Sequence, residues 1–197
     1  MNSKPGIIIL AAGSSSRLGQ PKQLLDYKGI TLLQNTIVQA LVSVHKAIVV
    51  VTGASREAIE HELQNRAVTI YHHEDWAQGM GSSIAAGLHY LLQIEPVLTS
   101  CIIAVCDQPF ITSQVFQDLT EQHKVTRKGI VASAYAGTLG TPMLFSHMHF
   151  NALLKLTGQE GAKKLLQLYQ DDVASIPFDK GAVDIDTLAD YNKLINQ

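Results

Sequence analysis

The sequence has few of the features that mark secreted, membrane or nucleic-acid-binding proteins. It contains two cysteines, too few for a disulfide scaffold. No apolar run approaches the roughly 20 residues that cross a bilayer. The formal net charge is −2, whereas nucleic acids and anionic membranes require a dense basic surface. The composition therefore predicts a small-molecule partner, with neither a nucleic acid nor a membrane as the main one.

The amino-terminal segment MNSKPGIIILAAG also differs from a secretory signal peptide. Its apolar run is short, and no small-residue cleavage site follows it. We therefore expect a cytoplasmic protein in which Cys101 and Cys106 are reduced core thiols. Because an odd number of positions separates them within one predicted strand, their side chains should face opposite sides of a sheet.

What the chain does contain is a regular alternation of apolar segments. Of its 197 residues, 46% are hydrophobic, enough to bury one full core. β-Branched runs occur at GIIILAA, KAIVVVTG, VTIYHH, SCIIAVCD and GIVASAY, then at TPMLFS and VASIPF. Segments with helical periodicity lie between most of the first five runs, and further helices are predicted at LLKL, AKKLLQLY and from about Leu188. This pattern predicts an α/β fold with a mainly parallel sheet. No linker or repeat divides the chain, so we expect one domain over residues 1–197.

The loop after the first strand carries the strongest chemical signal. It is rich in Ala, Gly and Ser, so its backbone N–H groups can approach phosphate oxygens, and Arg17 and Lys22 supply positive charge. It is not a Walker loop, because Lys22 follows proline rather than glycine. It is not the dinucleotide fingerprint either, because Ser15 stands at the second glycine position. A different phosphate loop with Gly13 as its pivot is one interpretation, and an ordinary surface loop with solvated cations is the other.

The segment LAAGSSSRLGQPKQLL resembles the signature of the molybdenum cofactor nucleotidyltransferase family. Four further segments match patterns of that family in the same order, namely GMGSSIAAGL, CDQP, GTPMLF and DIDTLADY. The forms LAAG and CDQP are most similar to its cytidylyltransferase branch. The resemblance implies a Rossmann-like three-layer α/β/α sandwich of the nucleotide-diphospho-sugar transferase type. It also implies a nucleotide-binding half over about residues 1–110 and an acceptor-binding half over about 111–197.

The reaction that this resemblance implies is transfer of CMP from CTP to the phosphate of molybdopterin or its molybdenum-bound form, with release of pyrophosphate. Sugar- or alcohol-phosphate nucleotidyltransferases share the fold and are one alternative. Another alternative is a non-catalytic carrier that delivers the finished cofactor to an apo-molybdoenzyme. Such an apo-enzyme is also a possible partner of the transferase.

Aspartates at two places are candidate ligands for Mg²⁺. Asp107 directly follows the strand CIIAVC, at the sheet edge where open α/β folds bind ligands. A hard oxygen ligand there suits Mg²⁺, although an aspartate before proline can also simply form a turn. The resemblance makes Asp107 the metal-binding residue and favours Asp184 as the second ligand. Asp186 is the alternate, with a role in capping the last helix or supporting the site.

The segment GMGSSIAAGL turns directly into a helix and offers its first N–H groups to a ligand, and by resemblance its Gly81, Ser82 and Ser83 approach the base and ribose of the nucleotide. The end of the second central strand, at VTGA, is another candidate for contacting the pyrimidine edge. Ser82 or Ser83 can also serve as the N-cap of that helix. The predicted nucleotide-binding residues are Leu10, Ala11, Ala12, Gly13, Ser14, Ser15, Arg17, Lys22, Thr52, Gly53, Gly81, Ser82, Ser83 and Asp107. The catalytic residues among them are Arg17, Lys22 and Asp107.

Acceptor binding is assigned by resemblance to Gln108, Thr141, Pro142 and Lys163, and the alternative for Lys163 is a solvated helix lysine, which is the commoner case. Two positions depart from the family pattern and bear on the acceptor. Thr141 stands where the family often has histidine, and Gln159 stands where aspartate is usual. Trp76 has two interpretations, as a side chain that closes over a ligand or as a partly buried aromatic.

Overall fold

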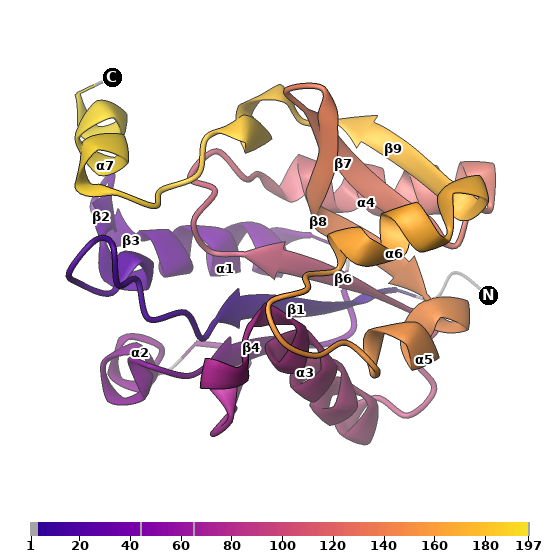
Figure 1. The fold of residues 1–197 in the computed structure, drawn as a ribbon, viewed down its shortest axis with the longest axis horizontal. Coiled ribbons are helices and arrows are strands. Elements are labelled where there is room, and N and C mark those ends of the chain that lie inside the picture. The colour runs from indigo at the N-terminus through magenta and orange to yellow at the C-terminus, as the bar shows by residue number, and fades with distance from the viewer. Residues whose placement is uncertain (1–3, 44, 65, 197) are drawn as a thin grey trace.

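A seven-stranded sheet forms the centre of the molecule (Figure 1). The computed structural model describes residues 4–43, 45–64 and 66–196. In spatial order the strands are β5 (Thr69–His72), β4 (Ile48–Thr52), β1 (Gly6–Ala11), β6 (Ser100–Val105), β8 (Thr138–Ser146), β7 (Ile130–Tyr135) and β9 (Val173–Pro177). All neighbouring pairs are parallel except those of β8, which is antiparallel to β6 and β7. The predicted mainly parallel sheet is confirmed.

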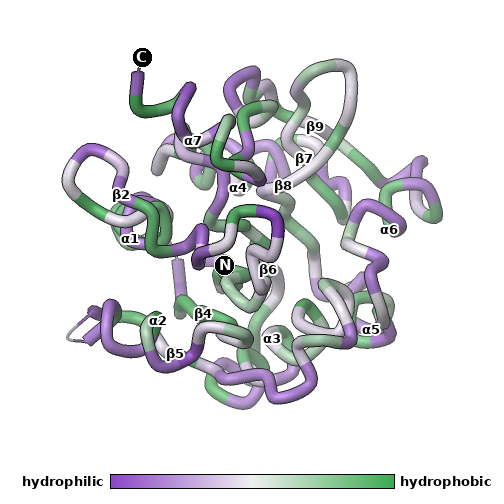
Figure 2. Tube along the Cα trace, turned by 60° about the vertical axis from the view of Figure 1, so that its left-hand side comes forward, coloured by the Kyte–Doolittle hydropathy of each residue, from purple (hydrophilic) through white to green (hydrophobic). Residues whose placement is uncertain are grey.

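Helices cover both faces of the sheet because its inner strands are apolar on both sides. One apolar layer lies under α1 (Leu32–Val42), α2 (Arg56–Glu62) and α4 (Ser113–Thr126). The other lies under α3 (Met80–Ile94), α5 (Phe150–Leu153) and α6 (Lys163–Leu168). Consecutive residues of β1 alternate between the layers, with Ile7 and Ile9 in the first and Ile8 and Leu10 in the second. The three-layer α/β/α sandwich is confirmed, and Figure 2 shows hydrophilic segments mainly at the periphery.

The two cysteines lie in opposite layers, as predicted. Cys106 belongs to the layer under α1 and α4, and Cys101 belongs to the layer under α3. Both are free thiols and both are buried. Burial raises the pKa of the Cys106 thiol to about 12, so it stays protonated at neutral pH.

A small third apolar cluster joins the hairpin that follows the first loop to the last helix described. The strands β2 (Asp26–Tyr27) and β3 (Ile30–Thr31) form a short hairpin, and α7 (Leu188–Ile195) packs beside it (Figure 1). Ile185 and Leu194 contribute to the same apolar cluster as Tyr27. The hydroxyl of Tyr191 donates a hydrogen bond of 2.9 Å to the Asp26 carbonyl. This contact brings the segment before α7 close to the loop after β1.

Five 3₁₀ turns complete the described elements. They are η1 (Lys22–Leu24), η2 (Trp76–Gln78), η3 (His147–His149), η4 (Gln170–Asp172) and η5 (Asp179–Ala182). Among the described residues, none of the helices combines the length and hydrophobicity that spanning a membrane requires.

Leu88→Ala should destabilise the fold by about 2–5 kcal/mol, because it removes a fully buried side chain and leaves a cavity. The neighbouring Gly87 lets α3 approach the side chains of Ile8 and Val51 closely, so little space is left for the site to relax. Urea denaturation measures the free energy of unfolding. Val97→Ala is the control, since Val97 is 78% exposed, and it should change stability by less than about 0.5 kcal/mol. Equal effects of both changes would contradict this packing.

Candidate active site

The candidate site lies at the carboxyl ends of β1 and β6. In the sheet, β1 pairs with β4 on one side and with β6 on the other. The strands β4 and β5 are therefore added on one side of β1, and the later strand β6 is added on the opposite side. The loop of residues 12–21 leaves β1 here, and Asp107 follows β6. This reversal of strand order separates the two loops and creates the crevice in which open α/β sheets bind ligands.

The loop after β1 is folded around Gln23, whose side chain is almost fully buried. The Gln23 amide Nε2 donates two hydrogen bonds of 2.9 Å, to the carbonyls of Ala11 and Gly13. Ser15 supports the same turn, because its Oγ accepts a 3.0 Å hydrogen bond from the Lys22 backbone N–H. All of these contacts come from the chain itself, so they organise the backbone of the loop.

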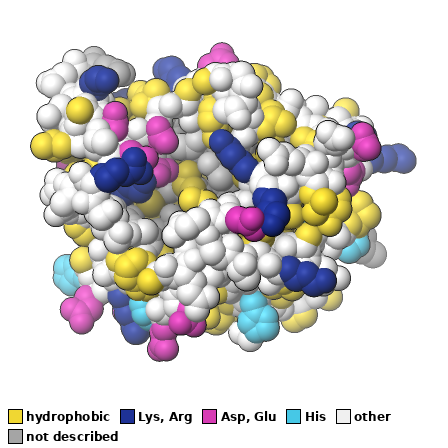
Figure 3. Space-filling view, viewed as in Figure 1, with side chains coloured by type: hydrophobic (Ala, Val, Ile, Leu, Met, Phe, Trp, Pro, Cys, Tyr) yellow, Lys and Arg dark blue, Asp and Glu magenta, His cyan; other side chains and the backbone are white. Residues whose placement is uncertain are grey.

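The cations and carboxylates of the site form one connected cluster. Lys22 Nζ lies 2.5 Å from Asp107 Oδ2 and 2.9 Å from Asp186 Oδ1, and Arg17 Nη2 lies 2.9 Å from Asp186 Oδ2. Burial alone would lower the pKa of Lys22, but Asp107 and Asp186 outweigh it and raise that pKa above its usual value. Lys22 therefore keeps its charge at neutral pH. Figure 3 shows basic side chains next to acidic ones on the surface beside α7.

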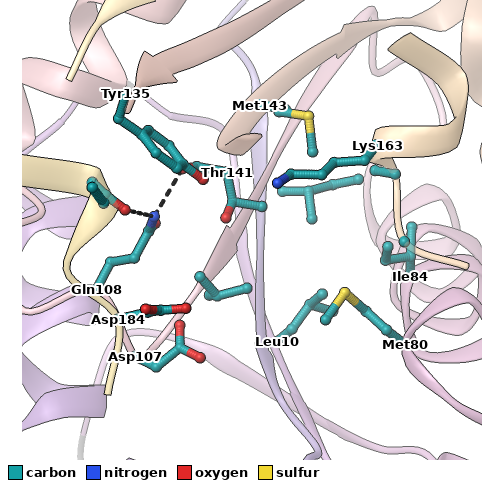
Figure 4. Close-up of a pocket in the computed structure, with 16 residues that line it drawn as sticks. Leu10, Met80, Ile84, Asp107, Gln108, Tyr135, Thr141, Met143, Lys163 and Asp184 are labelled. Carbon is teal, nitrogen blue, oxygen red and sulfur yellow. Dashed lines mark hydrogen bonds between the residues drawn. The ribbon is translucent and has the colours of Figure 1, made fainter. Parts of the chain in front are cut away.

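The two aspartates of VDIDT have different surroundings. Hydrogen bonding to Lys22 lowers the pKa of Asp186. Partial burial, together with the charges of Asp107 and Asp186, raises the pKa of Asp184. Asp107 and Asp184 face the same pocket (Figure 4). Asp186 is not the cap of the last helix, because Thr187 is its N-cap and forms a capping box with Asp190.

Asp107 and Asp184 lie in one pocket, where a divalent cation between their carboxylates would be favourable. Two carboxylates in one pocket disfavour each other's charge, and a hard cation relieves that repulsion. Among the residues that the structure describes, no three His, Cys, Asp or Glu side chains form a complete metal cage. One or two carboxylates completed by substrate phosphates and water is a common arrangement for Mg²⁺.

Two compartments meet at Asp107. The first, of roughly 380 Å³, has a largely apolar wall and is lined by Leu10, Met80, Ile84, Ile103, Val105, Asp107, Gln108, Tyr135, Thr141, Met143, Gly161, Ala162, Lys163, Gly181, Ala182 and Asp184. The second, of roughly 370 Å³, is lined by Leu10, Ala12, Gly13, Ser14, Lys22, Gln23, Trp76, Ala77, Gly79, Met80, Ser83, Val105, Cys106, Asp107 and Gln159. Figure 4 shows Asp107 and Asp184 at one side of the first compartment and Lys163 at the other.

Comparison with known proteins agrees with this architecture. The model of the protein family described as the MobA-like NTP transferase domain matches residues 7–173, which are most of the chain. The chain belongs to this family. The resemblance seen in the sequence is therefore confirmed, and the protein is a nucleotidyltransferase of the MobA-like type.

Individual relatives of this MobA-like protein carry different names. Nicotine blue oxidoreductase of Paenarthrobacter nicotinovorans is 28% identical and covers 95% of both chains. Molybdenum cofactor cytidylyltransferase of Escherichia coli strain K12 is 31% identical over 71% of this chain and 68% of that protein. The crystal structure of Rv0371c from Mycobacterium tuberculosis H37Rv has a TM-score of 0.86 at 26% identity, covering 99% of this chain and 100% of that one. A manganese complex of Rv0371c, with the same identity and coverage, has a TM-score of 0.80.

Within the MobA-like domain, half of the predicted nucleotide-binding residues line the second compartment. These are Leu10, Ala12, Gly13, Ser14, Lys22, Ser83 and Asp107. Ala11 faces the opposite apolar layer. Ser15 folds the loop, and Arg17 lies on the surface with 70% of its side chain exposed.

The other predicted nucleotide-binding residues lie outside that lining. Thr52 is fully buried, and its hydroxyl lies 3.3 Å from His72 Nδ1. Gly53 sits against Ala12 and Trp76. The sequence predicts a free N–H at Gly81, and this is wrong. The Gly81 N–H donates a hydrogen bond of 2.9 Å to the Gly158 carbonyl.

The serines of the second glycine segment do not begin the helix. Gly79 is the N-cap of α3, so the capping interpretation of Ser82 and Ser83 is wrong. The hydroxyl of Ser82 instead donates a 2.8 Å hydrogen bond to the Gly79 carbonyl. Ser83 is buried and reaches the second compartment.

Three of the four predicted acceptor residues, Gln108, Thr141 and Lys163, line the first compartment. Gln108 Nε2 donates to the Thr141 carbonyl at 3.1 Å and to the Gly181 carbonyl at 2.9 Å (Figure 4). Its Oε1 is buried and has no hydrogen-bond partner among the described residues. Pro142 is buried outside this lining, and its carbonyl accepts a hydrogen bond from Ser133 Oγ.

The sequence interpretation missed Gln23 and Tyr135. Gln23 precedes two leucines in a short turn, and no residue pattern indicates that its amide points inward. Tyr135 ends β7 and enters the first compartment, where burial raises the pKa of its hydroxyl. Its position at the end of a predicted strand was the only available signal.

Gln23→Leu should lower the free energy of unfolding by about 1–3 kcal/mol, because the Ala11 and Gly13 carbonyls would lose their donor. It should also speed amide hydrogen exchange in the loop of residues 12–21. Urea denaturation and hydrogen-exchange mass spectrometry measure the two effects. Gln20→Leu makes the same chemical change at an exposed position of that loop, and equal results for the two variants would show that Gln23 does not organise it.

Proposed function

We propose that this nucleotidyltransferase transfers CMP from CTP to the phosphate of molybdopterin, in its free or molybdenum-bound form, and releases pyrophosphate. The observation that carries the proposal is that Asp107 lines both compartments and pairs with Lys22, which lines the second. A triphosphate in the second compartment and an acceptor in the first would come together at Asp107. Each compartment draws residues from both the nucleotide-binding and the acceptor-binding half of the chain.

The basic side chains would hold the triphosphate. Lys22 pairs with Asp107 and Asp186 in the free protein, and both Lys22 and Arg17 can exchange these partners for phosphate oxygens. The backbone N–H groups of the loop around Gly13 would contact the same phosphates. Because Gln23 holds this loop in place, little reorganisation would accompany binding.

Asp107 and Asp184 would hold a magnesium ion. The ion would neutralise charge on the phosphate oxygens during transfer. The manganese complex of Rv0371c supports a divalent metal in this fold.

The acceptor phosphate would attack the α-phosphorus of CTP in line, with pyrophosphate as the leaving group. The second pKa of a phosphate monoester is about 6, so the nucleophile is already largely ionised at neutral pH. No protein nucleophile or strong base is required, and catalysis rests on positioning and on charge neutralisation. Gln108, Thr141 and Lys163 would orient the acceptor, and the apolar wall of its compartment would exclude water.

The choice of substrates rests on sequence likeness. The LAAG and CDQP forms, and the relative named molybdenum cofactor cytidylyltransferase, favour CTP and a molybdopterin acceptor. A sugar- or alcohol-phosphate acceptor is the alternative within the same reaction class. A carrier for an apo-molybdoenzyme is the alternative outside it, and the Lys22–Asp107 cluster favours the enzyme. We place the reaction in the cytoplasm.

The proposal is tested by pyrophosphate release with CTP, GTP, ATP and UTP, each with and without molybdenum-bound molybdopterin, in Mg²⁺ and after chelation. Release that requires CTP, the pterin and the metal is the expected result. Release with a sugar or polyol phosphate in place of the pterin would overturn the acceptor and keep the reaction class. Absence of release under every condition would overturn the transferase and favour the carrier.

Lys22→Ala should lower kcat/KM for pyrophosphate release by about 10²–10³, the usual effect of losing one preorganised charge donor. Steady-state kinetics measures this, and thermal unfolding checks that the variant is folded. Lys155→Ala removes an exposed lysine far from the cluster and should leave kcat/KM unchanged. Near-normal kinetics in Lys22→Ala would refute the role given to Lys22.

A further inference from the structure

The second compartment has two chemically distinct groups of lining residues. Lys22 and Asp107 are its charged residues, and they lie with the loop around Gly13, where the proposed function places the phosphates. The remaining lining includes Trp76, Gly79, Ser83 and Gln159 and carries no charge. Trp76 is the one aromatic side chain among the described lining residues, and it is the chain's only tryptophan.

The fold holds Trp76 against the ends of β1 and β4. Trp76 is the first residue of the turn η2, and its backbone N–H donates a hydrogen bond of 3.2 Å to the His73 carbonyl. Gly53 lies directly behind it, and a Cβ atom there would overlap both the Trp76 side chain and the Ala12 carbonyl. Glycine at position 53 therefore lets the Cβ and Cγ atoms of Trp76 pack closely against the backbone that follows β4. The side chain is only half-buried, so part of it remains available to a ligand.

The proposed function supplies a ligand that matches this division. A nucleoside triphosphate carries its charge at one end and a flat ring at the other. Because the phosphates would lie at Lys22, the ring would be left with the uncharged group of lining residues.

Resting on the proposed function, we propose that Trp76 is the surface on which the nucleobase of CTP packs. Stacking on an aromatic side chain contributes affinity for any base, because every base has a π-face. Gln159 lines the same compartment from a separate loop, and its amide offers both a donor and an acceptor to the edge of the base. Trp76 would therefore supply affinity, and the polar groups beside it would supply selectivity.

The single tryptophan makes the contact directly measurable. With excitation at 295 nm, CTP and CMP should change Trp76 fluorescence, whereas inorganic tripolyphosphate should bind by calorimetry without that change. CTP binding by calorimetry with unchanged fluorescence would overturn the proposal. If the wild type binds no nucleoside triphosphate by calorimetry, the proposed function falls together with this inference.

Two variants separate stacking from simple packing. Trp76→Leu, which keeps an apolar side chain without a ring, should raise the Kd for CTP roughly tenfold and leave the Kd for tripolyphosphate unchanged. Trp76→Phe should retain most of the affinity for CTP. The tripolyphosphate Kd also reports that the phosphate loop is intact. Unchanged CTP affinity in Trp76→Leu, or equal losses for both ligands, would refute the stacking role and leave the proposed function standing.

Discussion

The site depends on the ion pair between Lys22 and Asp107. This contact joins the loop after β1 to the end of β6, two segments that are 85 positions apart in the sequence. Asp186 adds a second carboxylate from the segment before α7. Because both partners of the Lys22–Asp107 pair are mostly buried, each would be costly to leave alone. The cations and the carboxylates of the site therefore keep one another in place.

Much of the fold could be predicted because its strands are buried on both faces. Runs such as IIIL and IVVV, with helical periodicity between them, predict buried strands, and the structure confirms these as β1 and β4. The β2–β3 hairpin could not be predicted in this way, since each of its strands has two residues. The antiparallel direction of β8 also escaped prediction, because direction depends on how the chain returns and not on the composition of the strand.

The proximity of candidate site residues could be predicted where each of them follows a strand of the parallel sheet. Lys22 and Asp107 follow predicted strands, and the structure brings them together. Gln23 is different, because its hydrogen bonds depend on which way its side chain points in a turn. Gly81 shows the same limit, since its N–H bonds to Gly158, a partner 77 positions away that the local pattern does not reveal.

The packing of α7 on the β2–β3 hairpin makes part of the charge cluster a late contact in folding. Lys22 and Asp186 are 164 positions apart, so loop-closure entropy opposes their contact until the sheet between them has formed. A change that detaches α7 from the hairpin would therefore separate Asp186 from its cations and leave the central sheet in place.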